Sequence, residues 1–201
     1  RAPKLGEHNG FAFTSDRIER KKSVEEIELP LTGVRVLDFG IGGVGVETSR
    51  LLGEYGADVI KVESRTYPDF IRLVALSETS PSFASSSRSK RSFGCNVKTE
   101  EGLEIIKKLL EKSDVLVENS ASGVMQSLGL GFETLKLINS EIIMVSSQLV
   151  GSSGPNSHWT GYGPTTQTYG GLLHLWDYDD DDPPATNGTI FPDHAAGRLC
   201  A

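Results

Sequence analysis

The chain has 201 residues, a length that suits one ordinary domain with a core of its own but not two generous ones. Its net charge is −7, and the one short basic cluster, Arg88–Arg91, gives no basic surface for nucleic acid. The two cysteines have neither disulfide nor metal-ligand spacing, which indicates a cytoplasmic protein that holds no metal. The sequence has no apolar run of about 18 residues, so we expect that the protein does not enter a membrane.

Both ends of the chain indicate a piece of a longer polypeptide. Residues 1–30 are polar and poorly periodic, and we expect a linker or tail there with room for one helical turn at Val24–Ile27. The last residues, His194–Ala201, have the character of the first turns of a helix that stops without a cap. We therefore expect a single domain over residues 31–201, truncated at its C-terminus.

A glycine-rich turn, Gly40–Gly45, lies between a strand and a helix. Val34–Phe39 is a short, mostly apolar run that predicts a buried parallel strand, and Gly56 is placed to end the following helix in a left-handed cap. A second strand, Ala57–Glu63, ends in an acid about 20 residues further on, which completes the nicotinamide-cofactor fingerprint. The turn suits any pyrophosphate, however, because glycines allow close approach and a helix N-terminus offers unpaired N–H groups.

Strands and helices then alternate. We predict strands at Ser92–Val97, Asp114–Glu118 and Glu141–Ser147, the last of them buried. Between them come a helix capped by Thr99 and a short helix at Phe132–Ile138. Four or five parallel strands with crossover helices predict an α/β fold with an open, doubly wound, mostly parallel, Rossmann-like sheet. Ligands bind such sheets beyond the carboxyl ends of the strands, so we expect the site in the loops that follow them.

Short motifs follow one another in a fixed order along the predicted domain. They are Leu31–Phe39, Gly56–Glu63, Pro68–Arg72, Ser89–Ser92, Lys98–Gly102, Ser113–Asn119, Gly123–Met125, Leu128–Gly131, Ser152–Pro155, Gln167, Gly170–Gly171, and Asp193 with Gly197. This series resembles the family III CoA-transferases, a group that includes formyl-CoA:oxalate and carnitine-type transferases and the α-methylacyl-CoA racemases. It is far more specific than any single motif in it. Lys4–Asn9 resembles the end of such a domain, which suggests a tandem protein whose first copy closes just before this one opens.

The resemblance implies where coenzyme A binds. Members of the family hold CoA against the first glycine turn and against the loops that follow the later strands. Basic residues would bind the CoA phosphates, since anionic ligands favour charge-assisted hydrogen bonds. The implied contacts are Gly43, Val44, Arg65, Lys90, Arg91, Cys95, Asn96, Val97, Lys98, Asn119, Ser120 and Ala121.

Asp193 matches the catalytic aspartate of the family. The resemblance implies that its carboxylate attacks an acyl-CoA thioester, forms a mixed anhydride and then an aspartyl-CoA thioester, and passes CoA to a carboxylic acid. It also implies an interlocked homodimer for the full-length protein. An aspartate placed just before a helix is a natural N-cap as well, and the two roles can hold at once.

Departures from the family pattern keep other functions open. Family racemases carry a His-Asp pair where this chain has Tyr162–Gly163, which favours CoA transfer over two-base racemisation. Ser64 and Ser127 stand at positions that are basic in the family, although Arg65 adjoins the first. The alternatives are an acyl-CoA racemase, an NAD-binding oxidoreductase, or a non-catalytic CoA-binding half of a tandem protein. The 201-residue piece alone is expected to be inactive, because family members have further segments that complete the enzyme.

Overall fold

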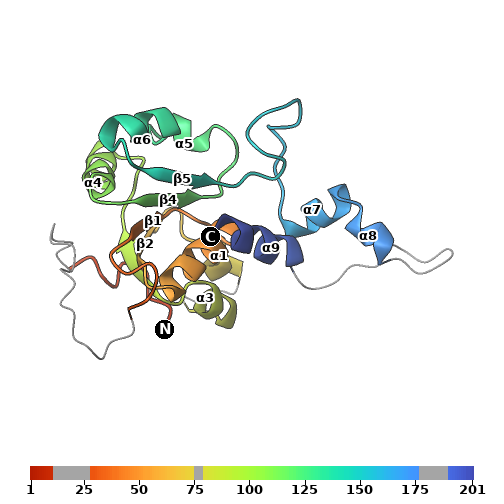
Figure 1. Cartoon of the computed structure of the whole chain (residues 1–201), viewed down its shortest axis with the longest axis horizontal. Helices are drawn as coiled ribbons and strands as arrows, with labels where there is room; N and C mark the ends of the chain where they lie inside the picture. Colours follow the sequence, from red (N-terminus) through yellow and green to blue (C-terminus); the bar gives the residue numbers. More distant parts are fainter. Residues whose placement is uncertain (11–27, 75–78, 177–189) are drawn as a thin grey trace.

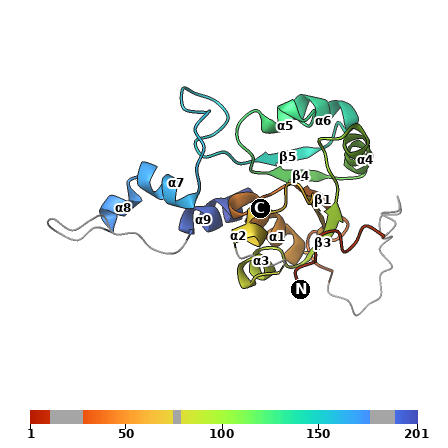
Figure 2. The ribbon, with the colours of Figure 1, turned by 180° about the vertical axis from the view of Figure 1, so that it is seen from behind.

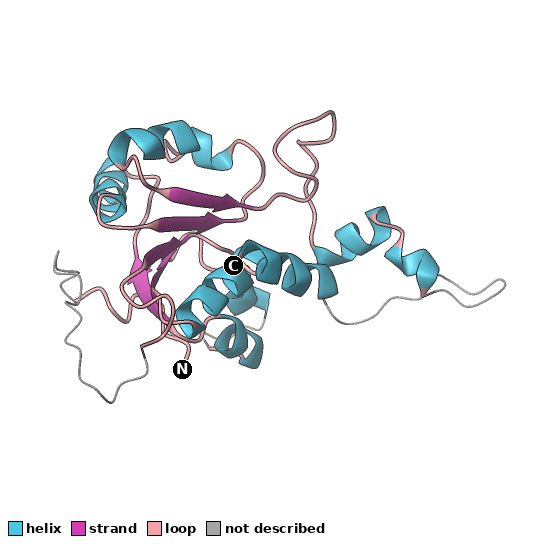
Figure 3. Cartoon of the chain, in the orientation of Figure 1, coloured by secondary structure: helices cyan, strands magenta, loops and turns pink. Residues whose placement is uncertain are grey.

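A five-stranded sheet forms the centre of the computed structural model, which describes residues 1–10, 28–74, 79–176 and 190–201. The strands are ordered β3-β2-β1-β4-β5, and every neighbouring pair is parallel. Figure 3 shows the strands in magenta between the helices. Their bounds are β1 Arg35–Asp38, β2 Asp58–Glu63, β3 Lys90–Gly94, β4 Val115–Glu118 and β5 Ile143–Ser146. The predicted open parallel α/β sheet is confirmed.

Helices cover both faces of the sheet (Figures 1 and 2). One face carries α4 (Glu100–Leu110), α5 (Val124–Ser127) and α6 (Phe132–Ile138). The other carries α1 (Gly43–Glu54), α2 (Phe70–Val74), α3 (Pro81–Ser86) and α9 (Phe191–Cys200), while α7 (Gly163–Tyr169) and α8 (Leu172–Leu175) project away beside α9. Within the described ranges, none of these helices has the length and apolar character needed to cross a bilayer.

Successive strand residues supply two separate apolar cores. Leu37 and Ile60 are fully buried with Ile106 on the α4 side of the sheet, whereas Val36 and Val59 pack with Leu52 of α1 on the other side. This follows from the pleat of the strands, which directs alternate side chains to opposite faces. The two cores hold helices on both faces and fix the orientation of the sheet between them.

Most predicted elements are confirmed, while some of their bounds and one prediction of burial differ. The helix α6 spans the predicted residues, and α4 follows Thr99, whose Oγ1 accepts a hydrogen bond from the Gly102 N–H at 3.1 Å. The strand predicted from Ser92 begins two residues earlier, as β3. The last strand is predicted to be buried, but among the described residues β5 is an edge strand that pairs with β4 alone, and its Ile143 is 59% exposed.

The first ten residues dock on the outer edge of β3. The Gly6 N–H donates to Ser92 Oγ at 2.9 Å, the His8 N–H donates to the Ser92 carbonyl at 3.1 Å, and the Gly94 N–H donates to Asn9 Oδ1 at 2.8 Å. An edge strand presents unpaired backbone groups, and this segment satisfies several of them. The helical turn predicted at Val24–Ile27 lies outside the described residues.

We expect Thr99→Ala to lower the free energy of unfolding by about 1 kcal/mol, because the N-terminal amides of α4 lose their side-chain acceptor. Equilibrium denaturation in urea measures the difference. Ser122→Ala in an exposed loop is the control. Equal stability of the two variants would contradict the capping role.

Candidate active site

Two loops meet where the strand order of the sheet reverses, between β1 and β4. Asn119, which follows β4, joins them. Its Oδ1 accepts the Ile41 N–H at 2.9 Å, and its Nδ2 donates to the Ile41 and Gly42 carbonyls at 3.1 and 3.0 Å. The side-chain amide of Asn119, implied by the family resemblance to be a CoA contact, is therefore engaged in holding the glycine turn.

Protein groups fill the space beside the glycines of the turn. A Cβ added at Gly42, whose φ is +50°, would lie 2.0 Å from Cε1 of the Phe70 ring. A Cβ added at Gly45 would lie 2.7 Å from Asn119 Oδ1. Glycine is needed at both positions for contacts within the chain itself.

The acid of the nicotinamide-cofactor fingerprint is also occupied. Glu63 at the end of β2 is buried, and its carboxylate accepts hydrogen bonds from Arg72 Nε and Nη2 at 3.0 and 2.9 Å and from the Asp69 N–H at 3.0 Å. A dinucleotide would need this carboxylate for the ribose hydroxyls and the space above Gly42 for the pyrophosphate. The structure therefore gives no support to the NAD hypothesis.

Asp193 lies over the start of α1. A Cβ added at Gly43 would lie 3.0 Å from Asp193 Oδ1, and one added at Gly163 would lie 2.6 Å from Asp193 Oδ2. The carboxylate thus stands between the first residues of α1 and α7. The predicted N-cap role is wrong, because α9 begins at Phe191 and Ile190 occupies the cap, which puts Asp193 in the first helical turn.

Close packing of α9 on α1 sets the position of Asp193. A Cβ added at Gly197 would lie 2.6 Å from Glu47 Cγ, so only glycine allows this approach. The Gly197 carbonyl accepts a hydrogen bond from Thr48 Oγ1 at 3.2 Å, and His194 Nδ1 lies 3.5 Å from Glu47 Oε1. The imidazole next to Asp193 is therefore directed to α1.

The electrostatic setting of Asp193 disfavours its ionised form. Burial raises the pKa of this carboxyl group above the usual aspartate value, and the smaller influence of His194 lowers the pKa. Among the described residues, no side chain or backbone N–H donates a hydrogen bond to the carboxylate. An ionised carboxylate without donors is more basic and more nucleophilic than a well-solvated one.

Two aromatic rings pack against each other next to the glycines that adjoin this carboxylate, and sequence reasoning gave them no role there. The rings of Phe70 and Tyr162 are 5.5 Å apart between centroids at an interplanar angle of 56°. Phe70 covers Gly42, and Tyr162 immediately precedes the glycine that touches Asp193. Phe70 lies in a motif of the ordered series, so its presence was visible in the sequence while its contact with the turn was not.

Lys90 is held inside the protein. Its Nζ lies 2.8 Å from each of Asp38 Oδ2, Val46 O and Ser49 Oγ, and its side chain is fully buried. Burial lowers the pKa of Lys90 to about 8. All three N–H donors of an ammonium group are used by these partners. This arrangement does not fit the phosphate contact that the resemblance implied for Lys90.

Arg91 also has a structural partner. It is ion-paired with Asp58, whose other carboxylate oxygen accepts Arg35 Nε at 3.0 Å. Asp58 is the first residue of β2, so this pair lies at the amino ends of the strands. Binding sites of such sheets lie at the carboxyl ends, and the implied phosphate contact of Arg91 does not fit this position.

Arg65 and Lys98 are both exposed, on two loops that are in contact with each other. Lys98 Nζ lies 3.8 Å from the centroid of the Tyr67 ring, a cation–π contact that brings together the loops after β2 and β3. Arg65 is exposed on the first of these loops, and Lys98 is exposed on the second. Both loops follow carboxyl ends of strands, where the family resemblance places CoA.

The remaining implied contacts are divided between two loops. In the loop after β3, Cys95 Sγ lies 3.4 Å from the Gly102 carbonyl, burial raises the pKa of the Cys95 thiol, and Asn96 Oδ1 accepts the Lys98 N–H at 3.1 Å, with Val97 between them. After β4, the Ser120 N–H donates to the buried Glu118 carboxylate at 2.7 Å, and Ala121 is exposed. Ala121 lines a cavity of about 330 Å³ at the ends of β4 and β5, together with Glu118, Met125, Met144 and Gln148.

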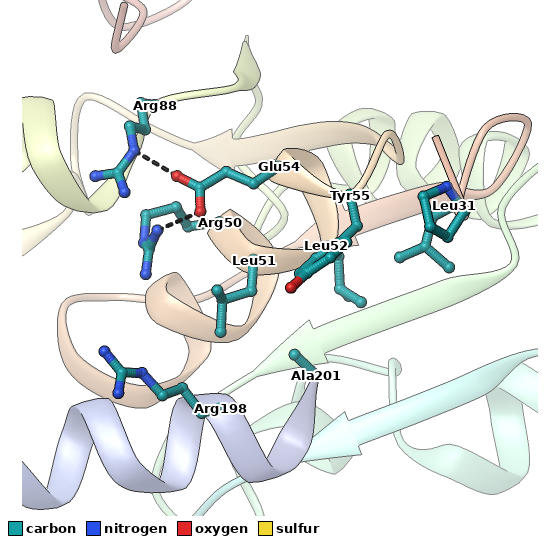
Figure 4. Close-up of a pocket in the computed structure, with 10 residues that line it drawn as sticks. Leu31, Arg50, Leu51, Leu52, Glu54, Tyr55, Arg88, Arg198 and Ala201 are labelled. Atoms are coloured by element: carbon teal, nitrogen blue, oxygen red, sulfur yellow. Dashed lines mark hydrogen bonds and ion pairs between the residues drawn. The ribbon is translucent and has the colours of Figure 1, made fainter. Parts of the chain in front are cut away.

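A larger cavity, of about 760 Å³, lies elsewhere, between α1 and α9 (Figure 4). Arg50 and Arg88 both reach the Glu54 carboxylate there, and Arg198 stands on the opposite wall. Asp193 does not line this cavity. Size alone therefore does not identify the candidate site.

In the part of the chain that is described, no three or more His, Cys, Asp and Glu side chains are grouped so as to hold a metal ion.

The fold and the site define the class: this is an open parallel α/β protein with a carboxylate over the start of the helix that follows its glycine turn. The chain belongs to CoA-transferase family III, whose family model matches residues 31–201. It is 37% identical over 179 residues to a probable CoA-transferase of Mycobacterium tuberculosis, with 86% of this chain and 23% of that protein covered. It is 36% identical over 171 residues to the mouse succinyl-CoA:glutarate CoA-transferase, with 84% and 39% covered.

A solved structure supports the same relationship. A CAIB/BAIF family protein from Brucella suis superimposes with a TM-score of 0.79 at 32% sequence identity, covering 87% of this chain and 47% of that one. The chain thus spans less than half the length of these relatives.

We expect Asp193→Asn to raise the midpoint of thermal unfolding at pH 7. A carboxyl group whose pKa is higher in the folded than in the unfolded state lowers stability as the pH rises between the two values, and the penalty persists at neutral pH. The difference from wild type should shrink as the pH falls below the usual aspartate range, where both states are protonated.

Calorimetry over a pH series measures this difference. Glu133→Gln, an exposed acid in the first turn of α6, is the control and should change the midpoint little. A lower midpoint for Asp193→Asn than for wild type at pH 7 would show that the carboxylate stabilises the fold.

Proposed function

We propose that the complete protein is a CoA-transferase that moves CoA between an acyl-CoA thioester and a carboxylic acid, with Asp193 as its nucleophile. The observation that carries this proposal is the position of Asp193 between Gly43 and Gly163, at the switch point of a chain of this family. Relatives named as succinyl-CoA:glutarate and acetyl-CoA:oxalate CoA-transferases support an acyl-CoA and an acid as substrates.

The carboxylate of Asp193 carries the chemistry in four steps. It attacks the thioester carbonyl and expels CoA thiolate, which leaves a mixed anhydride. The thiolate then attacks the aspartyl carbonyl, releases the first acid and forms an aspartyl-CoA thioester. The incoming carboxylate attacks this thioester and expels the thiolate again, and the thiolate finally takes the new acyl group and frees Asp193.

The first turn of α1 supplies the donors that this chemistry requires. Each attack on a carbonyl group creates a negatively charged oxygen, which backbone N–H groups stabilise where they point at it. The first amides of a helix have no partner within the helix. The N-cap residue of α1 is Gly42, and no side-chain hydrogen bond caps the helix there. We therefore assign Gly43 and Val44 to this role beside Asp193, in agreement with their implied place in the CoA site.

The CoA phosphates would meet Arg65 and Lys98. Both are exposed at the carboxyl end of the sheet, whereas Lys90 and Arg91 are bound within the protein. The loop Ser120–Ala121 beside the smaller cavity completes the proposed CoA-binding surface.

Transfer accounts for the site better than racemisation. A two-base exchange of the α-proton requires a second titratable group facing Asp193. Gly43 and Gly163 lie against its carboxylate, Tyr162 stands where racemases carry a histidine, and the His194 imidazole lies 3.5 Å from Glu47. A non-catalytic half of a tandem protein is the remaining alternative, and for the complete protein we propose the interlocked homodimer that the family resemblance implies.

Asp193→Asn in the complete protein should lower CoA transfer by roughly a thousandfold or more, because the attacking oxygen is lost, while CoA binding persists. Transfer is followed with acyl-CoA and acid pairs, among them succinyl-CoA with glutarate, and binding is followed by calorimetry. Glu133→Gln should transfer CoA as wild type does. Undiminished turnover by the Asn variant would remove Asp193 as nucleophile and favour the non-catalytic alternative.

Lys98→Ala and Arg65→Ala should each raise KM for acyl-CoA by about two- to fivefold and leave kcat unchanged, since an exposed cation contributes modestly to phosphate binding. The effect should fade at high ionic strength. Lys112→Ala, past the far end of α4, is the control. Equal KM values for the Lys98 and Lys112 variants would place the phosphates elsewhere.

A further inference from the structure

Side chains hold every backbone polar group from Gly40 to Gly42. The Gly40 N–H donates to Asp38 Oδ1 at 2.8 Å. Asn119 accepts the Ile41 N–H and donates to the carbonyls of Ile41 and Gly42. The two remaining groups have charged, buried partners. Such complete bonding is unusual for a glycine-rich loop, which is otherwise free to change conformation.

Those two partners are Lys61 and Asp69. Lys61 Nζ donates to the Gly40 carbonyl at 2.7 Å, and both Asp69 oxygens lie 3.2 Å from the Gly42 nitrogen. The two side chains form an ion pair at 3.0 Å with no exposed surface on either. One buried ion pair therefore binds the turn through two backbone groups, the Gly40 carbonyl and the Gly42 N–H, one on each side of Ile41.

The residue that follows the gripped segment is Gly43, which touches Asp193 and has a φ of +62°. The residue after Asp69 is Phe70, whose ring covers Gly42. Loss or lengthening of the Lys61–Asp69 ion pair would shift the first amides of α1 relative to the Asp193 carboxylate. Displacements of about 1 Å in an active site can cost a hundredfold in rate.

We propose that Lys61 and Asp69 are positioning residues for the reaction proposed above, and that their buried ion pair fixes the oxyanion-binding amides against Asp193. The pair does not touch substrate. Its contribution is made through the Gly40–Gly42 backbone, and it rests on the proposed role of Asp193.

A purely structural ion pair makes a different prediction from a positioning one. Removing one partner leaves a buried unpaired charge and destabilises the protein in either case. Removing both partners together eliminates that charge, so part of the lost stability returns even where the turn is no longer held. Activity then separates the two roles, because Lys61→Met with Asp69→Asn leaves the Gly40 carbonyl without its donor.

The experiment compares Lys61→Met, Asp69→Asn and the double variant in the complete protein. Each single variant should lose about a hundredfold in kcat, with KM for acyl-CoA unchanged, and should unfold at a lower temperature. The double variant should regain part of the unfolding temperature that the single variants lose, but not the kcat. Hydrogen exchange of the Gly40–Val44 amides should be faster than in wild type in all three.

Asp114→Asn is the matched control, because it alters a carboxylate that accepts the Arg35 N–H at 2.9 Å at the amino end of the sheet. It should lower the unfolding temperature and leave kcat at the wild-type level. Recovery of kcat in the double variant, or unchanged amide exchange, would overturn the positioning role. A wild-type protein without transferase activity would refute the proposed function instead, and amide exchange would still decide whether the pair holds the turn.

Discussion

Buried lysine–carboxylate pairs under the β1–α1 turn are the constraint on which the site depends. Lys61 and Lys90 have no exposed surface, and each needs a partner because an unpaired buried ammonium is costly. Their partners, Asp69 and Asp38, also bind the N–H groups of the turn. The charges that must be neutralised in the core thus fix the backbone of Gly40–Gly42, which leads directly into Gly43, the residue that lies against Asp193.

The glycine motif has a different use here from the one that its spacing suggests. In a dinucleotide site the second glycine makes room for a pyrophosphate, whereas Gly42 makes room for the Phe70 ring. Glu63 likewise binds Arg72 in place of a ribose. The same strand-turn-helix unit can therefore bring its helix N-terminus to the carboxylate of Asp193, because the unpaired amides are a property of the helix and not of any cofactor.

The strands and main helices were predictable because their signals are local. Thr99 begins α4 as its cap chemistry indicates, and Phe132–Ile138 forms α6 with the predicted bounds. The partners of Lys90 and the position of Asp193 could not be predicted, since they depend on contacts between segments far apart in the chain. A usable signal was present: a lysine amid the apolar residues of β2 needs a partner, which Asp69 supplies.

The surroundings of Asp193 suggest why small residues gather at this point. The carboxylate lies against Gly43 and Gly163, where a Cβ would come within 3.0 and 2.6 Å of its oxygens. Side chains there would collide with the proposed nucleophile or cover it, and hydrogen-bond donors would stabilise the charge that has to attack in the proposed reaction. A carboxylate with no donor among the described residues and a raised pKa costs stability. That cost is tolerable because α9 is held by its close contact with α1 at Gly197, away from the oxygens of Asp193. Rigidity is thus supplied by helix packing and buried ion pairs, and the carboxylate itself is left free to react.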